Sequence, residues 1–473
     1  MVVGLLMVLP WVQPWAPAPL PNVVPLLISW SCMGLLMVLG LRVQALDIAR
    51  AWAIAAALSS AMGLAQYFGL ADALGQWVHM PEFVGEARAN LRQRNQLATL
   101  TSVGIMATLW WVSNGLHRLH ALWLLALLAA GNAATNSRTG LLQMLLVTIL
   151  VILWTRLRRS SQGLSWRWVL WALGVYILSS WILPLLLAAS SGSDALSALT
   201  RMGSNDGCGS RRVLWANVLE LIAQKPWWGW GWNELKYAHY SASYSGERFC
   251  DILGNAHNGP LQLAFALGIP MATLIMLTLL AITWAMRPWQ VRPIQHQLAW
   301  GVLAVIGLHS LLEFPLWYGP FQMALVLCVV LLLPPRLDVS AVQQRILPFV
   351  GTGILAAAAF IAVDYARVRQ IFMPDSQRSK LWPGDALSVA KSSMVFQTTA
   401  LFAEYSMTPV TADNAAPMLA TGLELLHYSP EPKVIRKVIE AAKLIGDEKT
   451  AEHHKALMKA AFPSEPETLK PAQ

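Results

Sequence analysis

Three arginines and one histidine have the types and spacing best suited to chemistry in this 473-residue chain. Arg138 lies in the motif NSRTG, Arg211 and Arg212 open the run SRRVLWANVLELIAQ, and His257 follows in NAHNGPLQLAF. Arginine binds phosphate oxygens through paired hydrogen bonds, and histidine accepts a hydroxyl proton near neutral pH. The set favours a reaction at a phosphate-bearing substrate. The alternatives are a snorkelling arginine at Arg138 and a structural histidine at His257.

Arg211 and Arg212 stand at the start of a predicted amphipathic helix, residues 213–224. Its apolar stripe at helical spacing is Leu214, Val218, Leu221 and Ile222. The helix dipole disfavours cations at this end, so an adjacent pair there favours a bound anion such as phosphate. The run PWWGWGW then ends the helix at Pro226. An interfacial helix with a tryptophan belt is the alternative explanation of the whole segment.

Two further segments combine polar side chains with neighbouring apolar runs. In LHSLLEFPLWYGP, His309 and Glu313 are four residues apart and would share a helix face, and Tyr318 follows them. They are either a structural pair or part of a site. The second segment, EARANLRQRNQLAT, holds three arginines, Arg88, Arg92 and Arg94, together with the amides Gln93 and Asn95 near them. A solvated loop is the alternative there.

The composition indicates which elements must position these residues. The chain is 56% hydrophobic and 12% charged, with 23 tryptophans, whereas soluble proteins carry about 25% charged residues. A cytosolic enzyme, a disordered chain and a disulfide-stapled mini-domain are excluded, and a polytopic membrane protein remains. Eleven apolar segments predict spans, at about 1–10, 24–41, 51–69, 96–113, 119–135, 139–155, 168–189, 261–286, 298–312, 319–333 and 346–363.

Charge distribution predicts the orientation of these spans. The loop 156–167 carries four arginines and therefore faces the cytoplasm. Alternation then puts the N-terminus inside, and the loops 70–95 and about 190–260 outside with the tail. The first segment is short for a span, and a cleaved signal peptide there is disfavoured because no charged region precedes it. The net charge of +9 divides between inside loops and one outside face, which disfavours nucleic acid as a partner.

Cysteines and absent motifs narrow the chemistry further. Cys208 and Cys250 lie in the large outside loop, where an oxidising compartment would let them form a disulfide, with two free thiols as the alternative. Cys32 and Cys328 lie in apolar runs and read as packing residues. The chain has no P-loop motif and no CxxC, and its outside carboxylates are scattered. We therefore expect no metal site and no cofactor.

The order NSRTG, SRRVLW…KPWWGWGW, NAHNGPLQLAFALG and HSLLEFPLWY, over roughly residues 80–335, resembles the bacterial O-antigen ligase and O-oligosaccharyltransferase superfamily. It is most similar to the PglL-type protein O-oligosaccharyltransferases. The resemblance implies an all-α polytopic membrane protein, a GT-C-like helical bundle with a large periplasmic loop. It also implies transfer of a glycan from undecaprenyl pyrophosphate to a hydroxyl. The acceptor is a protein Ser or Thr, often of a pilin, or a lipid A–core sugar in the ligase branch.

The resemblance also implies residue roles. Trp215 follows Arg211 by four, so Arg211 matches the family's RxxxW pattern. Arg138 and Arg211 would then bind the pyrophosphate, and His257 would take or orient the acceptor proton. The remaining set would bind substrate, namely Arg212, Gln93, Arg94, Asn95, Asn258, Tyr318, His309 and Glu313. Gly259 and Pro260 would end any helix at that point, so a turn is expected to set the surroundings of His257.

The tail after the last apolar segment has ordinary soluble composition, which predicts a membrane body at 1–366 and a helical domain at 367–473. Two helical stretches around Gly446 and Asp447 form an αα-hairpin that resembles a tetratricopeptide unit. Facing the periplasm, the tail would present the acceptor protein or stabilise the enzyme, and it favours the PglL-type branch.

An inner-membrane enzyme is the leading hypothesis, with membrane lipids, a lipid-linked glycan and an acceptor protein as partners. An O-antigen ligase or polymerase is the alternative within the superfamily. A lipid-linked sugar transporter is the alternative of another class, but a carrier would favour charged or broken helices at mid-membrane. The unusual residues gather on outside loops instead.

Overall fold

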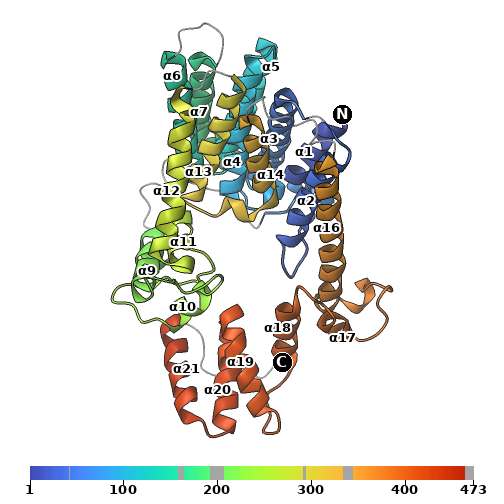
Figure 1. Cartoon of the computed structure of the whole chain (residues 1–473), viewed down its shortest axis with the longest axis vertical. Helices are drawn as coiled ribbons and strands as arrows, with labels where there is room; N and C mark the ends of the chain where they lie inside the picture. Colours follow the sequence, from blue (N-terminus) through green and yellow to red (C-terminus); the bar gives the residue numbers. More distant parts are fainter. Residues whose placement is uncertain are drawn as a thin grey trace. The chain divides into compact units, whose positions relative to one another are not determined.

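The computed structural model describes residues 1–41, 43–81, 83–157, 164–191, 207–290, 294–333 and 345–463, and every regular element within them is a helix (Figure 1). The chain forms two compact units. The first comprises Met1–Ser204 and Ile282–Phe360, and the second comprises Asn205–Ala281 and Ile361–Gln473. Each unit has its own apolar cores. The predicted domain boundary after residue 366 falls within the last apolar helix, and the division into 1–366 and 367–473 stays a prediction.

The first unit is a helical bundle whose long helices coincide with predicted apolar segments. They are α1 (Val2–Val12), α2 (Val23–Val38), α3 (Ala45–Tyr67), α4 (Arg94–Val112), α5 (Arg118–Ala134), α6 (Arg138–Leu157), α7 (Trp166–Ser191), α13 (Ile294–Ser310), α14 (Gly319–Leu332) and α16 (Leu347–Arg369), which runs on into the second unit. Short 3-10 helices η1 (Ala71–Trp77), η2 (Ala89–Leu91), η4 (Pro288–Gln290) and η5 (Pro315–Trp317) lie between them.

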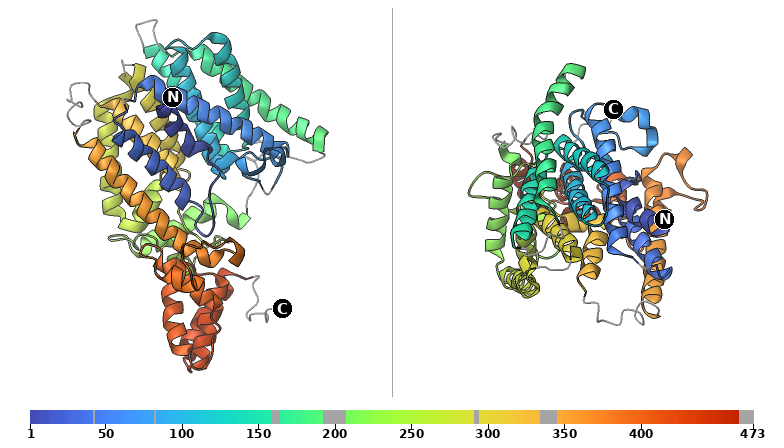
Figure 2. Two further views of the ribbon diagram at one scale, coloured as in Figure 1. Left: turned by 90° about the vertical axis from the view of Figure 1, so that its right-hand side faces the viewer. Right: turned by 90° about the horizontal axis from the view of Figure 1, so that it is seen from above.

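Helix α4 is the centre of this bundle, with every residue from Asn95 to Trp110 buried. It packs against α3, α5, α6 and α13, and Figure 2 shows these helices from two sides. Small residues allow the close approach: Gly104 faces Ala56 of α3, and Gly301 of α13 faces Met106. Such contacts are typical of helix packing in membranes, where apolar burial alone does not drive helices together.

Five described helical segments are long and apolar enough to cross a membrane: Ala45–Tyr67, Arg138–Leu157, Trp166–Ser190, Ile269–Gln290 and Leu347–Phe372. Helices α1, α2, α5 and α14 are apolar but shorter. The chain is therefore a membrane protein whose described regular elements are all helices, and the count of eleven spans stays a prediction. At 11 residues, α1 is about half the length that a span requires.

The second unit combines the large loop with the tail. The loop region holds η3 (Gly207–Gly209), α9 (Arg211–Gln224), α10 (Leu235–Ser241), α11 (Gly259–Leu267) and α12 (Ile269–Met286), which continues into the first unit. The tail holds η6 (Gln370–Phe372), η7 (Asp375–Gln377), α17 (Ala386–Lys391), α18 (Gln397–Met407), α19 (Ala415–Tyr428), α20 (Pro432–Leu444) and α21 (Glu448–Ala461).

The last three tail helices, α19, α20 and α21, lie side by side (Figure 1). The hairpin predicted around Gly446 and Asp447 is confirmed. Gly446 has a φ of 78°, and the Asp447 side chain accepts a hydrogen bond from the backbone N–H of Thr450 at the start of α21. Both features depend only on residues within the turn, so the sequence is enough to predict it.

The single span predicted at 261–286 is wrong in one respect, because the helix breaks at Gly268. This residue has a φ of 84°, and a Cβ at that position would overlap the carbonyl of Trp227. The N–H of Ile269 donates to the carbonyl of Pro226 at 2.7 Å. The turn after α9 therefore packs backbone-to-backbone against the junction of α11 and α12, an approach that only glycine allows.

Replacing Gly268 by Ala should therefore destabilise the protein by about 1–3 kcal/mol, because the new Cβ meets backbone at a left-handed φ. Gly174→Ala in α7 is the matched control, since nothing lies within 4 Å of a Cβ there. Thermal unfolding in detergent should give a lower Tm for Gly268→Ala only. Equal melting temperatures for the two variants would contradict the close packing at Gly268.

Candidate functional site

Segments that the sequence predicts on one side of the membrane meet at one end of the first unit. The Arg92 guanidinium donates to the carbonyls of Pro14 at 2.8 Å and Ala16 at 3.2 Å. The Asn136 side chain donates to the carbonyl of Gly85 at 2.7 Å. The connector after α1, the segment before α4 and the turn before α6 are therefore held together. This is the end at which the NSRTG motif lies.

A buried amide, Asn95, links three elements at this end. Its Nδ2 donates to Glu313 Oε1 at 3.0 Å, and its Oδ1 accepts from the Ser137 hydroxyl at 2.6 Å. Asn95, Ser137 and Glu313 are all less than 9% exposed. Because an unpaired polar group is costly in such surroundings, the network fixes the turn that carries Arg138, the next residue after Ser137. Arg138 itself is half-buried at the first position of α6.

His309 and Glu313 both bond to α4 through their side chains. His309 Nδ1 lies 2.8 Å from Thr99 Oγ1, which also accepts from Gln143 Nε2 at 2.8 Å. Helix α13 ends at Ser310, so Glu313 lies in the following turn rather than on the predicted helix face, although its N–H still donates to the carbonyl of His309 at 2.8 Å. The structure thus brings Asn95, His309 and Glu313 into one region around α4.

The arginines before α4 have partners within the protein. Glu86 accepts from Arg88 Nε at 2.7 Å and from Arg94 Nη1 at 2.8 Å. Glu86 lies two residues before Arg88 in the same segment and was not among the residues predicted from the sequence. Gln93 caps α4, since its Oε1 accepts from the N–H of Gln96 at 2.7 Å. The structure gives Gln93 and Arg94 structural partners, and their predicted role toward substrate stays a prediction.

A pocket of about 220 Å³ adjoins this region. Two of the residues predicted to bind substrate, Gln93 and Tyr318, line it together. The Tyr318 hydroxyl bonds to the side chains of Asn22 and Gln96. Gln13, which sequence reasoning missed, also lines the pocket and is 5% exposed. Pockets for small ligands are typically about 300–1,000 Å³, so this one suits a group the size of one sugar ring rather than an oligosaccharide.

In the second unit, the predicted amphipathic helix is confirmed as α9. Its whole predicted stripe is buried, namely Leu214, Val218, Leu221 and Ile222. Ser210 caps the helix, with its hydroxyl accepting from the N–H of Val213 at 3.3 Å. Arg211 is half-buried and Arg212 is exposed. The positive end of the helix dipole and the two arginines attract anions at this helix start.

Three connections tie α9 to the segment that leads to His257. A disulfide joins Cys208 to Cys250, with 5.5 Å between their Cα atoms. The Asn217 side chain donates to the carbonyl of Glu247 at 2.9 Å and accepts from the N–H of Phe249 at 2.8 Å. The Trp215 indole N–H donates to the carbonyl of Ala256 at 3.1 Å. Trp215 is one turn after Arg211, so the helix face that carries Arg211 is fixed beside the His257 turn.

His257 lies on a turn immediately before α11. Its φ is 48°, and its N–H donates to Asn255 Oδ1 at 2.8 Å. Asn258 caps α11 by accepting from the N–H of Leu261 at 2.9 Å. The expectation that Gly259 and Pro260 end a helix is wrong, because they begin one, and proline is favoured at the first turn. A left-handed non-glycine residue is uncommon, and such backbone conformations concentrate at functional sites.

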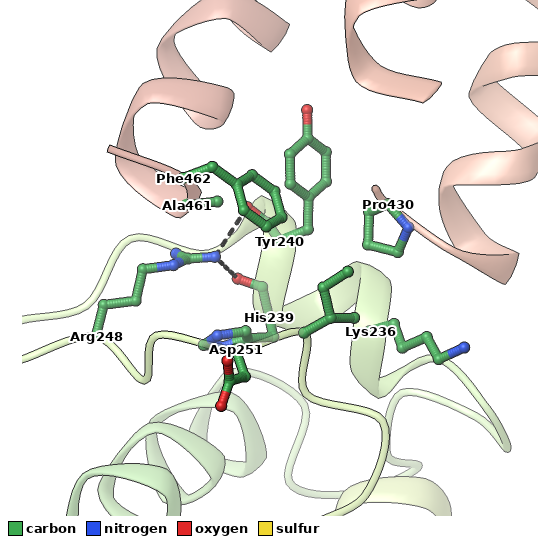
Figure 3. A pocket seen from close by; sticks show the side chains of 9 residues that line it. Lys236, His239, Tyr240, Arg248, Asp251, Pro430, Ala461 and Phe462 are labelled. Carbon is green, nitrogen blue, oxygen red and sulfur yellow. Dashed lines mark hydrogen bonds between the residues drawn. The ribbon is translucent and has the colours of Figure 1, made fainter. Parts of the chain in front are cut away.

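A smaller cavity lies between α10 and the tail helices (Figure 3). The Arg248 guanidinium donates to the carbonyls of His239 and Ala242 at 2.5 and 2.9 Å. Burial and this cation lower the pKa of His239 to about 4. Tyr240 and His454 share a hydrogen bond of 2.9 Å. The cavity is about 10 Å³, enough for one water, so these residues join loop to tail rather than hold a substrate.

The structure therefore gives two groups of predicted residues, one in each unit. The first unit brings together Asn95, His309 and Glu313, with Arg138 on the adjoining turn and Gln93 and Tyr318 in the neighbouring pocket. The second unit brings together Arg211, His257 and Asn258. Among the described residues, no group of three His, Cys, Asp or Glu side chains has metal-binding geometry. Convergence of the two groups on one substrate stays a prediction.

Comparisons with known proteins agree with the class that this fold and site define, a helical membrane protein with a cationic loop site. Three family models match successive parts of the chain: "Protein glycosylation ligase" over residues 87–112, "O-Antigen ligase" over 121–276, and "Virulence factor membrane-bound polymerase, C-terminal" over 297–473. Arg138, Arg211 and His257 all fall within the second match. The predicted resemblance to the O-antigen ligase and PglL-type glycosylation ligase families is therefore confirmed as a similarity over these ranges.

One curated relative is the general O-oligosaccharyltransferase of Acinetobacter baylyi (strain ATCC 33305 / BD413 / ADP1). It is 25% identical over 246 residues, which cover 49% of this chain and 41% of the relative. The chain thus matches less than half the length of that protein.

Proposed function

We propose that this protein transfers an oligosaccharide en bloc from undecaprenyl pyrophosphate to a Ser or Thr hydroxyl of a periplasmic protein such as a pilin. The matches to the glycosylation ligase and O-antigen ligase family models and the name of the Acinetobacter relative support this class of reaction. The observation that carries the proposal for this chain is the bond from Trp215 to Ala256, which holds the Arg211 helix face beside the His257 turn. An arginine and a histidine on segments that are joined in this way suit attack on a sugar phosphate.

The reaction exchanges one C–O bond for another. The bond between the anomeric carbon and the pyrophosphate oxygen breaks, and the acceptor oxygen forms the new bond to that carbon. Arg211 stabilises the negative charge that develops on the leaving pyrophosphate, and His257 takes or orients the hydroxyl proton. An in-line attack inverts the anomeric centre. No step in this scheme needs a metal ion or a cofactor.

The first unit would bind the rest of the donor. We assign Arg138 to the pyrophosphate as well, because the Asn95 network fixes the turn that carries it. Gln93 and Tyr318 line a pocket of sugar-ring size, which suits glycan or acceptor positioning. Arg94, Asn95, His309 and Glu313 would support these contacts, and Arg212 and Asn258 would do so in the second unit. The proposed location is the bacterial inner membrane, with the N-terminus in the cytoplasm and the site and tail in the periplasm.

A second candidate function has its own support. The longest matches carry the descriptions "O-Antigen ligase" and "Virulence factor membrane-bound polymerase, C-terminal", which favour transfer of O-antigen to lipid A–core or to another glycan. These reactions share the donor and differ in the acceptor. The acceptor therefore separates the two functions.

The direct test gives purified protein a lipid-linked glycan together with a pilin, or with lipid A–core. We expect a mass increase of one glycan on a Ser or Thr of the pilin, read by intact-mass and peptide mass spectrometry. Heat-denatured enzyme is the control. Transfer to lipid A–core alone, or chain extension of the lipid-linked glycan alone, would contradict the protein acceptor and support the second function.

Arginine variants test the assignment of the cations. Arg211→Ala should lower the transfer rate about 100-fold or more, the usual effect of losing one preorganised charge donor, and His257→Ala should abolish transfer. Arg212→Ala should cost less because that side chain is exposed. Arg118→Ala, at the start of α5 and outside the proposed site, is the control with normal transfer. Each variant should retain the wild-type melting temperature.

Normal transfer by both Arg211→Ala and His257→Ala would contradict this site. A loss shared equally by Arg118→Ala would indicate a general effect of removing arginine instead.

A further inference from the structure

Three tryptophans on the turn between α9 and α10 are exposed to an unusual degree. Trp227 is 71% exposed, Trp228 is 89% exposed and Trp232 is 55% exposed. An exposed cluster of large aromatic side chains is a liability in water and marks an interaction surface. We call residues 226–232 the tryptophan turn.

The tryptophan turn has a fixed position relative to α12. The N–H of Ile269, the first residue of α12, donates to the carbonyl of Pro226 at 2.7 Å, and the carbonyl of Trp227 packs against Gly268. The N–H of Trp230 donates to the carbonyl of Phe265 at 2.8 Å. The exposed indoles are therefore held at the N-terminal end of α12. The tryptophan turn cannot slide along α12 without breaking these bonds.

The helix that begins at this point is a candidate membrane span. Residues Ile269–Gln290 are long and apolar enough to cross a bilayer, and almost none of their side chains are buried within the protein. An apolar helix that is exposed on all sides requires lipid around it. Its first residue then lies near the boundary between hydrocarbon and headgroups, and the tryptophan turn lies at the same depth.

The chemistry of the turn suits that boundary better than it suits a protein partner. Indole combines a large apolar ring with one N–H donor, and tryptophan is enriched at the membrane–water interface for this reason. Lys225 lies beside the cluster, with Nζ 3.9 Å from the centre of the Trp230 ring. A lysine at the edge of an apolar patch reaches anionic headgroups while its carbon stem covers apolar surface.

We propose that Trp227 and Trp228 insert into the headgroup region of the bilayer and anchor the loop that carries α9 and the His257 turn. Through the bonds from α9 to residues 247–256, the anchor sets the depth of Arg211 and His257. This step rests on the proposed function: the depth that the anchor sets is the depth of the phosphates of a lipid-linked donor. The partner is the lipid surface itself.

Depth-dependent quenching tests the anchor without any enzymatic readout. Trp228→Cys is labelled with a bimane probe in nanodiscs whose lipids carry bromine at a shallow or a deep acyl position. The native cysteines do not compete, since Cys32 and Cys328 are buried and the other two form a disulfide. Lys449→Cys, exposed at the start of α21, is the matched control.

We expect shallow bromines to quench the probe at position 228 at least twofold more than the probe at position 449. Equal quenching at the two positions would overturn the proposal. Loss of probe accessibility only when an acceptor protein is added would also overturn it, because the surface would then be a protein-docking site.

A kinetic experiment distinguishes an effect on membrane anchoring from an effect on the transfer reaction. Trp227→Ser with Trp228→Ser should raise KM for the lipid-linked donor about fivefold or more while kcat is retained, and the matched double tyrosine variant should restore KM. A short-chain, water-soluble donor should show no such difference. An unchanged KM in the serine variant would count against the anchor. If no variant or wild-type protein transfers glycan, the proposed function fails while the quenching result still decides the anchor.

Discussion

The hydrogen bond from the Trp215 indole to the carbonyl of Ala256 is the constraint on which the site in the second unit depends. Arg211 lies on a helix and His257 lies on a turn 46 residues later. They stay close only if bonds hold the loop between them in one conformation. The disulfide between Cys208 and Cys250 and the two bonds of Asn217 add to the same connection. Together they turn a long loop into a rigid support for Arg211 and His257.

The first unit solves a related problem by a different means. Its helices pack through small residues around α4, and the polar groups among them must be paired internally because neither lipid nor apolar core offers them a partner. The Asn95 side chain forms hydrogen bonds to both Ser137 and Glu313, and the Thr99 hydroxyl forms hydrogen bonds to both His309 and Gln143. The network fixes the turn before α6 and so determines where Arg138 can reach.

The features that the sequence predicts correctly are those that depend on neighbouring residues. Each apolar segment contains a helix, the stripe along α9 is buried as its spacing predicts, and the hairpin turn at Gly446 follows from glycine and the Asp447 cap. Helical periodicity and capping depend on residues within a few positions of one another, so one sequence is enough to read them.

The features that were missed depend on contacts between distant segments. Gly268 breaks a continuous apolar run where the backbone of Trp227 packs against it. Gly268 followed by Pro270 is a local helix-stop signal that was overlooked, but no local signal reports the contact with Trp227. Likewise, the link between Tyr240 and His454 joins loop to tail across 214 residues. Gly259 and Pro260 were misread for another reason: the same dipeptide ends one helix or begins the next, and only the cap by Asn258 decides.

The transfer rate of Trp215→Phe tests most directly whether Arg211 and His257 depend on this bond. Phenylalanine keeps an aromatic ring packed against the apolar core of the loop region but cannot donate to the carbonyl of Ala256. We predict at least a tenfold lower kcat with a lipid-linked glycan donor and a melting temperature close to that of the wild type. A wild-type kcat would show that Arg211 and His257 do not need this bond to act together, and would contradict the account.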